Sequence, residues 1–130
     1  SKAINRIIDA VPGENREQIR GVLSILLQGV LSQRLCKRAD GEGRIAILEI
    51  LLQNYAVANM IRENKIHLLD SYLQSANPQE TGMQSLDTCT FQYLREGLIE
   101  LDEGLVNVAN PSLLKERYRK AKEDAERVVL

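Results

Sequence analysis

One stretch of the sequence, RADGEGRIAILEILL, sets the strongest limit on how this chain folds. At its centre, Asp40-Gly41-Glu42-Gly43 contains two glycines, which adopt the positive φ angles of a tight hairpin without steric cost. The residues on either side predict two strands, and Ile45 to Leu52 is apolar at every position except Glu49, which is typical of a strand covered on both faces. We therefore expect one hairpin among elements of another kind.

Apolar residues at helical spacing predict those other elements. A first helix is expected over about residues 2–11, where Pro12-Gly13 ends it, and a second carries a long apolar stripe from a capping box at Asn15 and Gln18 to Leu31. After Asn54, a possible cap, helices are expected at about 55–63, 65–75, 84–96 and 100–109, with a loop over 76–82 and a stop at Gly97. The predicted fold class is predominantly α with a small β-hairpin or sheet edge.

A last helix is expected over about residues 112–130, after Asn110-Pro111. Its narrow apolar stripe consists of Leu114, Tyr118, Ala121, Ala125 and Val128. Two i,i+4 ion pairs, Glu116 with Lys120 and Glu123 with Arg127, are expected to support its solvated faces.

Composition excludes several classes of partner. The 130 residues include 17 basic and 18 acidic side chains, and the resulting net charge of -1 creates no general attraction to nucleic acid or anionic lipid. Cys36 and Cys89 lie in apolar segments without a CxxC pair, which is typical of a reducing compartment such as the cytosol. No uncharged apolar run is long enough to insert in a membrane. At this length a single folding unit is expected.

The patterns of self-contained catalysis do not occur in this sequence, so no catalytic residue and no metal site are predicted. His67 is the only histidine, which excludes zinc sites built from several histidines. The acidic residues Glu96, Glu100, Asp102 and Glu103 are best explained as charges at a helix start. The basic residues Arg34, Lys37, Arg38 and Arg44 around the hairpin leave two interpretations open, a solvated sheet edge or a contact with an acidic group or phosphate.

The segment AVANMIRE draws attention because of the polar residues on its helical pattern. We expect Val57, Met60 and Ile61 to face a core, with Asn59, Arg62 and Glu63 on the other side. Periodicity alone predicts an ordinary amphipathic helix here.

Five blocks in order resemble the closing segments of the twitching-motility (PilT-like) ATPases, which retract type IV pili: KAINRIIDAVP, QIRGVLSILLQGVLSQRL, RADGEGRIAILEIL, AVANMIRENK and GMQSLDTCTFQYLREGLI. They cover about residues 2–110. The family's retraction motif, AIRNLIRE, maps onto Ala56, Val57, Ala58, Asn59, Met60, Ile61, Arg62 and Glu63. Val57 and Met60 are conservative departures from it, whereas Ala58 stands where the family has an arginine.

This resemblance implies a RecA-like α/β P-loop ATPase that assembles as a homo-hexamer, of which the chain is the carboxy-terminal portion. Residues 1–53 are then the tail of the ATPase core, with two helices and the hairpin, and residues 54–130 a helical extension carrying the retraction motif. ATP and Mg²⁺ are expected to bind mainly upstream, because the chain has no GxxxxGK[ST] loop. The chain alone is expected neither to hydrolyse ATP nor to bind a cofactor. Gln33 and Arg34 are the candidates for residues near the nucleotide.

The implied location is the cytoplasmic face of the inner membrane, with a pilus platform protein as partner. Alternatives are a pilus extension or type II secretion motor, a non-retracting paralogue, and a free-standing helical adaptor that docks by its last helix. A chain lacking the parallel sheet of the core should also leave open the apolar faces that cover this sheet, including Ile7, Ile8 and Leu26.

Overall fold

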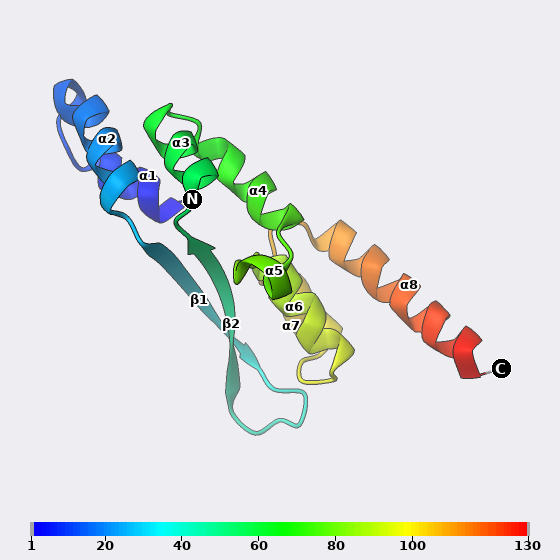
Figure 1. The fold of residues 1–130 in the computed structure, drawn as a ribbon. Coiled ribbons are helices and arrows are strands. Elements are labelled where there is room, and N and C mark those ends of the chain that lie inside the picture. Colours follow the sequence, from blue (N-terminus) through cyan, green and yellow to red (C-terminus); the bar gives the residue numbers. More distant parts are fainter. Residues whose placement is uncertain (1, 130) are drawn as a thin grey trace. The chain divides into compact units, whose positions relative to one another are not determined.

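The computed structural model describes residues 2–129, which form a hairpin and a series of helices (Figure 1). The strands are β1 (Gly29–Lys37) and β2 (Arg44–Leu52). The helices are α1 (Lys2–Asp9), α2 (Arg16–Leu26), α3 (Tyr55–Arg62), α4 (Leu69–Ser75), α5 (Pro78–Thr81), α6 (Leu86–Arg95), α7 (Leu101–Leu105) and α8 (Pro111–Val129), with 3₁₀ turns η1 (Gly13–Asn15) and η2 (Ile66–Leu68). The predominantly helical fold with a small hairpin is confirmed.

The described residues pack as two compact units, each built from two stretches of sequence. The first contains the residues up to Leu31 and Ile50–Gln84, and the second contains Ser32–Glu49 and the residues from Ser85 onward. Each unit has an apolar core of its own. The boundary between residues 53 and 54 is drawn from the family resemblance and separates the ATPase core from its extension. It stays a prediction, because the packing units of this chain alone do not test it.

The core of the first unit lies between α1, α2, α3 and α4. Its buried members are Ile4, Ile8, Leu51, Val57, Ile61, Ile66, Leu69, Leu73 and Met83. The expectation that Ile8 is left open is wrong, because Ile8 shares one side of α1 with Ile4 and is only 3% exposed. Ile7, on another side of the helix, is 47% exposed, and Leu26 of α2 is 66% exposed.

The second unit is built around buried residues from the hairpin and from the last helices: Cys36, Ile47, Cys89, Leu94, Ile99, Val108 and Leu114. Burial raises the pKa of the Cys36 thiol, and the Glu103 carboxylate adds to the effect. Helix α7 ends at Leu105, earlier than the predicted residue 109, and the Asn107 amide donates to the Gly104 carbonyl over 3.1 Å.

The second helix ends earlier than predicted, and this is the largest error in the predicted elements. Leu27 already has an extended backbone, and Val30 and Leu31 belong to β1 instead of α2. Pairing with β2 overrides the helical spacing of the leucines. A Cβ atom at position 29 would lie 3.1 Å from the Leu51 carbonyl oxygen, so Gly29 permits this close pairing.

The start of α2 also differs from the prediction. Asn15 makes no side-chain capping bond, so the predicted capping box is wrong, and η1 leads directly into the helix instead. At the other end, the Gln53 side-chain amide donates to the carbonyl oxygens of Ser24 and Ile25, both at 3.0 Å. A side chain from the end of β2 therefore satisfies the last carbonyls of α2.

The hairpin itself forms where it was predicted. Gly41 and Gly43 have φ angles of +79° and +81°, in the left-handed region that favours glycine. Strand β2 is less covered than expected, since Ile47 and Leu51 are buried whereas Leu52 is 39% exposed. The prediction that both faces of this strand are covered is therefore wrong for β2 in this chain.

The hydrogen bonds of the hairpin turn lower the pKa of the Asp40 carboxyl, which can be tested by titration. The Arg38 guanidinium, 2.7 Å from Oδ2 of Asp40, and the Glu42 amide hold the pKa of that carboxyl below its ordinary value. The ionised Asp40 thus stabilises the turn above its ordinary pKa, and this contribution is lost as the pH falls through the lower, folded-state pKa. We expect Arg38→Gln to raise the Asp40 pKa in an NMR titration, with Arg44→Gln as the control that leaves it unchanged. An unaltered pKa in Arg38→Gln would contradict the pairing.

Two further differences concern α5 and α8. Residues predicted as a loop contain α5, whose first turn is capped by the Asn77 side chain and whose end has Gly82 at φ +71°. In α8, the Glu116–Lys120 pair is present at 3.1 Å, but Glu123 pairs with Arg119 at 2.8 Å instead of with Arg127.

The predicted apolar stripe of α8 is buried at one end alone. Leu114 is 2% exposed, whereas Val128 is 86% exposed. The second half of the helix thus extends away from the core of its unit. Within residues 2–129, no helix is both long and apolar enough to span a lipid bilayer.

Candidate functional site: the α3 motif segment

The motif helix α3 begins at a cap that also fixes it to its neighbour. The side-chain oxygen of Asn54 accepts a hydrogen bond from the Val57 amide at 2.8 Å, as predicted for an N-cap. Its Nδ2 donates to the Tyr72 hydroxyl on α4 over 2.7 Å. A single side chain thus starts α3 and joins it to α4.

The apolar side of α3 is held tightly in the core of the first unit. Val57 and Ile61 are 1% and 0% exposed, and they lie in one cluster with buried residues of α1 and α4. Residues of α2, including Ile19 and Leu23, pack against the same cluster. Because close-packed interiors resist small deformations, α3 should move together with the rest of this unit.

The opposite side of α3 carries the polar residues of the motif. Arg62 donates a hydrogen bond to Oδ1 of Asn59, one turn earlier, and its Nε lies 3.9 Å from Oε1 of Glu63. The Arg62 and Glu63 side chains are 47% and 61% exposed. Val57 and Ile61 are thus buried and Arg62 and Glu63 accessible, as predicted, whereas Met60 is only partly buried and lies on the same face as Asn59 and Glu63.

The end of the motif helix is a defined turn. Asn64 has a φ of +58°, a left-handed conformation that asparagine tolerates at a helix end. The Lys65 amide then donates to the Met60 carbonyl at 2.7 Å. This turn folds the backbone after α3 back against the end of the helix, so that Lys65 lies next to the motif.

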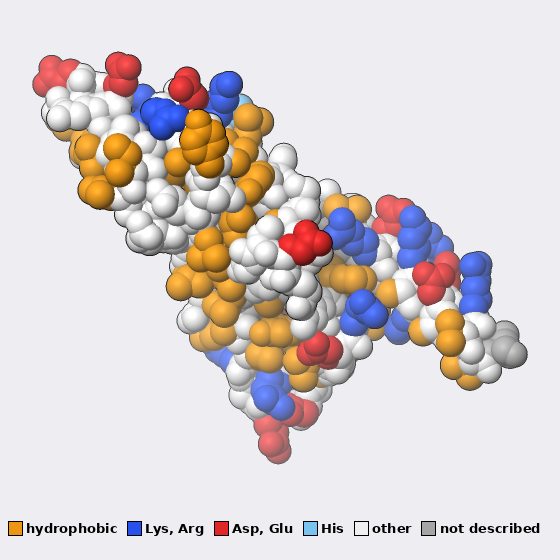
Figure 2. Space-filling view, in the orientation of Figure 1, with side chains coloured by type: hydrophobic (Ala, Val, Ile, Leu, Met, Phe, Trp, Pro, Cys, Tyr) orange, Lys and Arg blue, Asp and Glu red, His pale blue; other side chains and the backbone are white. Residues whose placement is uncertain are grey.

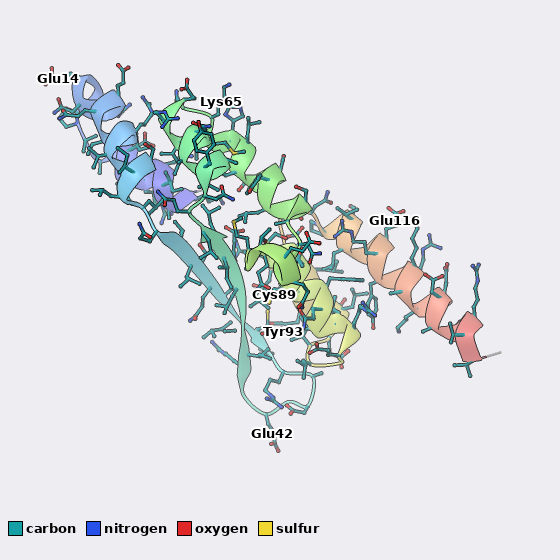
Figure 3. The ribbon with its side chains drawn as sticks, viewed as in Figure 1. Glu14, Glu42, Lys65, Cys89, Tyr93 and Glu116 are labelled. Carbon is teal, nitrogen blue, oxygen red and sulfur yellow. The ribbon has the colours of Figure 1, made fainter. Side chains whose placement is uncertain are left out.

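A shallow depression of about 450 Å³ lies on one side of the motif. Its lining consists of Ala56, Asn59, Met60, Glu63 and Lys65. The first four have the spacing of one helix face, and Lys65, labelled in Figure 3, comes from the turn that follows. An apolar floor with an acidic and a basic group at its edge fits a protein surface better than a small metabolite.

Gln33 and Arg34, the candidates for nucleotide proximity, belong to the second unit. Gln33 is exposed on β1, and the Arg34 guanidinium donates to the carbonyl oxygen of Asn107 at 3.0 Å. The neighbouring Lys37 amide donates to Oε1 of Glu103 over 2.8 Å. These bonds tie β1 to α7, and the role of the two residues toward nucleotide stays a prediction.

The side chains of the remaining clusters are largely engaged by contacts within the chain. Of the four basic residues around the hairpin, Arg34 and Arg38 bind oxygen atoms of the chain itself, so these two do not form a free basic patch. Glu103 and Glu96 accept hydrogen bonds from Lys37 and Gln92, and His67 lies exposed in η2. Among residues 2–129, no group of three or more His, Cys, Asp or Glu side chains is arranged to hold a metal ion.

Three residues around the motif were missed by sequence reasoning. Tyr72 and Gln53 bind it or its neighbours over long sequence separations, for which a single sequence gives no signal. Lys65 had a weak signal, because the asparagine at position 64 is typical of a helix end that folds back.

The cap provides a test of how the motif helix is held. Asn54→Ala should lower the free energy of unfolding by about 1–2 kcal/mol, since it removes the cap and leaves the start of α3 unsatisfied. Asn54→Asp keeps the capping oxygen and loses the donor to Tyr72, so it should cost less, as should Tyr72→Phe. Urea unfolding followed by circular dichroism measures all three. Equal stability of Asn54→Ala and the unmodified chain would show that the cap does not hold α3.

Comparisons with known proteins identify similar chains. The chain is 46% identical over 99 residues to the twitching motility protein of Neisseria gonorrhoeae and 39% identical over 99 residues to the type IV pilus retraction ATPase PilT of Pseudomonas aeruginosa; both alignments cover 76% of this chain. They cover 26% and 28% of those proteins, so the chain spans about a quarter of the curated relatives it matches. A crystal structure of the pilus retraction motor PilT with bound ADP matches at 35% identity with a TM-score of 0.75, over 88% of this chain and 31% of that one. No protein-family model matches the chain.

Proposed function

Because the chain is homologous to one segment of the PilT-like type IV pilus retraction ATPases, we propose that it is the carboxy-terminal coupling segment of a pilus motor. In this role it converts the nucleotide state of the motor into movement. The proposed enzyme is the full-length protein, an ATPase that transfers a phosphoryl group to water.

The construction of the motif helix is the observation that carries this proposal. Val57 and Ile61 are fixed in the core of the first unit, while Arg62 and Glu63 on the same helix remain accessible. Packed elements shift between discrete arrangements, so a change at the nucleotide displaces such a helix as a body. The polar face then exchanges its partners between the two arrangements. For Arg62 we propose a carboxylate on the same or a neighbouring subunit, since charge-assisted pairs are the stronger hydrogen bonds.

The catalytic chemistry belongs to other parts of the proposed motor. Phosphoryl transfer requires a phosphate loop, Mg²⁺ and a carboxylate that orients water, and the sequence of this chain contains no GxxxxGK[ST] loop. ATP and Mg²⁺ are thus proposed to bind mainly upstream, with Gln33 and Arg34 as possible neighbours of the nucleotide.

The proposed motor is a homo-hexamer at the cytoplasmic face of the inner membrane, where it acts on a pilus platform protein. The exposed apolar residues support the role of this segment as part of a larger assembly. Ile25 and Leu26 at the end of α2 are 70% and 66% exposed, and Tyr55 at the start of α3 is 83% exposed. Such residues are expected to pack against further protein.

Two alternatives assign the same segment to another kind of protein. A pilus extension or type II secretion motor would use the same construction, but the retraction-type motif at residues 56–63 favours retraction. A free-standing helical adaptor would act through binding alone. The homology to one part of much longer ATPases favours the motor.

ATP turnover tests the proposal directly. The 130-residue chain should hydrolyse no ATP above the rate of a buffer control, whereas the full-length protein containing it should hydrolyse ATP in a Mg²⁺-dependent reaction. A lysine-to-alanine change in the phosphate loop of the full-length protein is the control for contaminating enzymes. Turnover by the 130-residue chain, or its absence in the full-length protein, would refute the assignment.

A further inference from the structure

The apolar stripe of α8 has the spacing of a coiled-coil seam. Leu114, Tyr118, Ala121, Ala125 and Val128 follow one another at intervals of four, three, four and three residues. This is the alternation of positions d and a in a heptad repeat. Leu114 is buried in its own unit, whereas Ala125 and Val128 are exposed, so the outer half of the seam is left uncovered within residues 2–129.

The charges of α8 are sorted around this seam. On the outer face, Glu116 pairs with Lys120 and Arg119 with Glu123, so these charges neutralise one another. The positions beside the seam hold three cations and one acid: Lys115, Arg117, Lys122 and Asp124. Figure 2 shows Lys and Arg side chains along the visible face of α8.

The cations beside the seam have no acidic partner among residues 2–129. Over the part of the chain that the structure describes, Lys115, Arg117 and Lys122 form no ion pair within 4 Å. Nζ of Lys122 lies 5.0 Å from the centre of the Tyr118 ring and so borders the seam. On the outer face, two ion pairs and the opposite charges of Glu126 and Arg127 sum to zero, whereas the positions beside the seam hold three cations and one acid. The net positive charge of α8 therefore lies on the side on which a second helix would pack.

From this arrangement we propose that α8 binds an acidic amphipathic helix of another protein. The partner helix carries apolar residues at its own a and d positions and Glu or Asp beside them. The small side chains of Ala121 and Ala125 allow close approach of the partner backbone, and its carboxylates meet Lys115, Arg117 and Lys122. The part of the seam that its own unit leaves uncovered is about one heptad long, from Ala121 to Val128, so the complex is expected to be weak, transient and sensitive to salt.

The same charges exclude a second copy of α8 as the preferred occupant. In a parallel pair, position g of one helix faces position e of the other, which places Arg117 against Lys122. In an antiparallel pair, e faces e and g faces g, so the repulsion of lysine against lysine offsets the attraction of Arg117 to Asp124 and no net charge attraction results. Like charges at these positions oppose pairing, whereas an acidic helix converts each of them into an attraction.

Two synthetic peptides test this proposal on the intact 130-residue chain. Both are three-heptad helices with the same leucine and alanine seam; one has Glu at positions e and g, and the other has Lys there. Fluorescence anisotropy measures their binding at low and high salt. We expect the acidic peptide to bind roughly tenfold more tightly than the basic one, because the three cations outweigh Asp124, and this preference should shrink in high salt.

Variants of α8 locate the binding site. Reversing the three seam-flanking cations, Lys115→Glu, Arg117→Glu and Lys122→Glu together, should invert the preference between the peptides. Ala125→Asp should abolish binding of both, because it places a charge inside the seam. Arg127→Glu, on the outer face, is the control with no expected effect, and circular dichroism checks that every variant keeps its helix content.

Several results would overturn the proposal. These are equal affinity for the two peptides, no binding of the acidic peptide, and an unchanged preference in the triple variant. Light scattering adds another: a dimer of the chain that Ala125→Asp converts to monomer would show that a second copy occupies the seam. Inversion of the preference by the triple variant, with Arg127→Glu unaffected, establishes the site.

Discussion

Replacing Arg62 with alanine in the full-length motor is expected to leave the ring assembled and ATP hydrolysis intact while pilus retraction is impaired. In the structure described here, Arg62 donates to Asn59 and lies near Glu63, with nearly half of its side chain exposed. Its guanidinium is thus available to a carboxylate that becomes adjacent in another arrangement of the motor. A hydrogen bond to a charged group contributes roughly 1.5–3 kcal/mol. Its loss shifts the balance between two arrangements about ten- to a hundredfold.

Three measurements separate this effect from simple loss of the protein. Size-exclusion chromatography with light scattering reports ring assembly, ATP turnover reports the catalytic part, and twitching on agar reports retraction. Arg127→Ala removes an exposed arginine from the outer face of α8 and should retract normally. Arg62→Lys keeps the charge and loses the planar fork of the guanidinium, so partial retraction is expected. Normal twitching by Arg62→Ala would remove this residue from the mechanism.

Ile61→Ala should produce the largest loss of stability among changes to the motif. Ile61 is 0% exposed in the core of the first unit, and the change leaves a cavity between α3 and its neighbours. Substitutions of this kind lower the free energy of unfolding by about 2–5 kcal/mol. Urea unfolding measures the loss, and hydrogen exchange locates it. We expect amides of α2, α3 and α4 to lose protection, with smaller changes in α6 of the second unit.

A matched control uses an isoleucine of the same unit outside the core. Ile7 on α1 is 47% exposed, so Ile7→Ala should lower the free energy of unfolding by less than about 1 kcal/mol. Similar losses for the two variants would contradict the placement of Ile61 as a central core residue. Equal loss of protection throughout residues 2–129 would contradict the division into two separately packed units.

The sequence allowed the motif helix to be predicted well because its signals are local. Asn54 caps it, and the spacing of Val57 and Ile61 fixes its buried side. The glycines of the hairpin act in the same way, since a positive φ at Gly41 and Gly43 is a property of the turn itself. Features set by neighbouring residues depend little on the rest of the fold.

The errors arise where distant segments decide the outcome. Leucines at helical spacing predicted that the second helix continues to Leu31, but pairing of β1 with β2 begins at Gly29. The absence of a parallel sheet predicts that Ile8 is open, yet helices within the chain bury it. The bond between Asn54 and Tyr72 likewise joins residues 18 apart in sequence.

Exposure along α8 was the other property that periodicity could not give. The spacing of the stripe from Leu114 to Val128 is regular, so it predicts one apolar face but not how much of it is covered. In the structure the core of the second unit reaches the first turns of the helix, and Val128 remains 86% exposed. Burial depends on how far the neighbouring helices extend, which a single sequence does not state.

Rigid displacement of the motif helix with nucleotide state is the central claim, and pulsed electron paramagnetic resonance measures it most directly. Spin labels at His67→Cys and Glu17→Cys report one distance inside the first unit. In a second sample, a label at His67→Cys and another near the phosphate loop of the full-length motor report the distance from the first unit to that loop. Cys36 and Cys89 are 0% and 4% exposed and should resist labelling. We predict that the internal distance stays constant while the distance to the phosphate loop differs between ATP-bound and ADP-bound motors. A constant distance to the phosphate loop in both states would contradict the account.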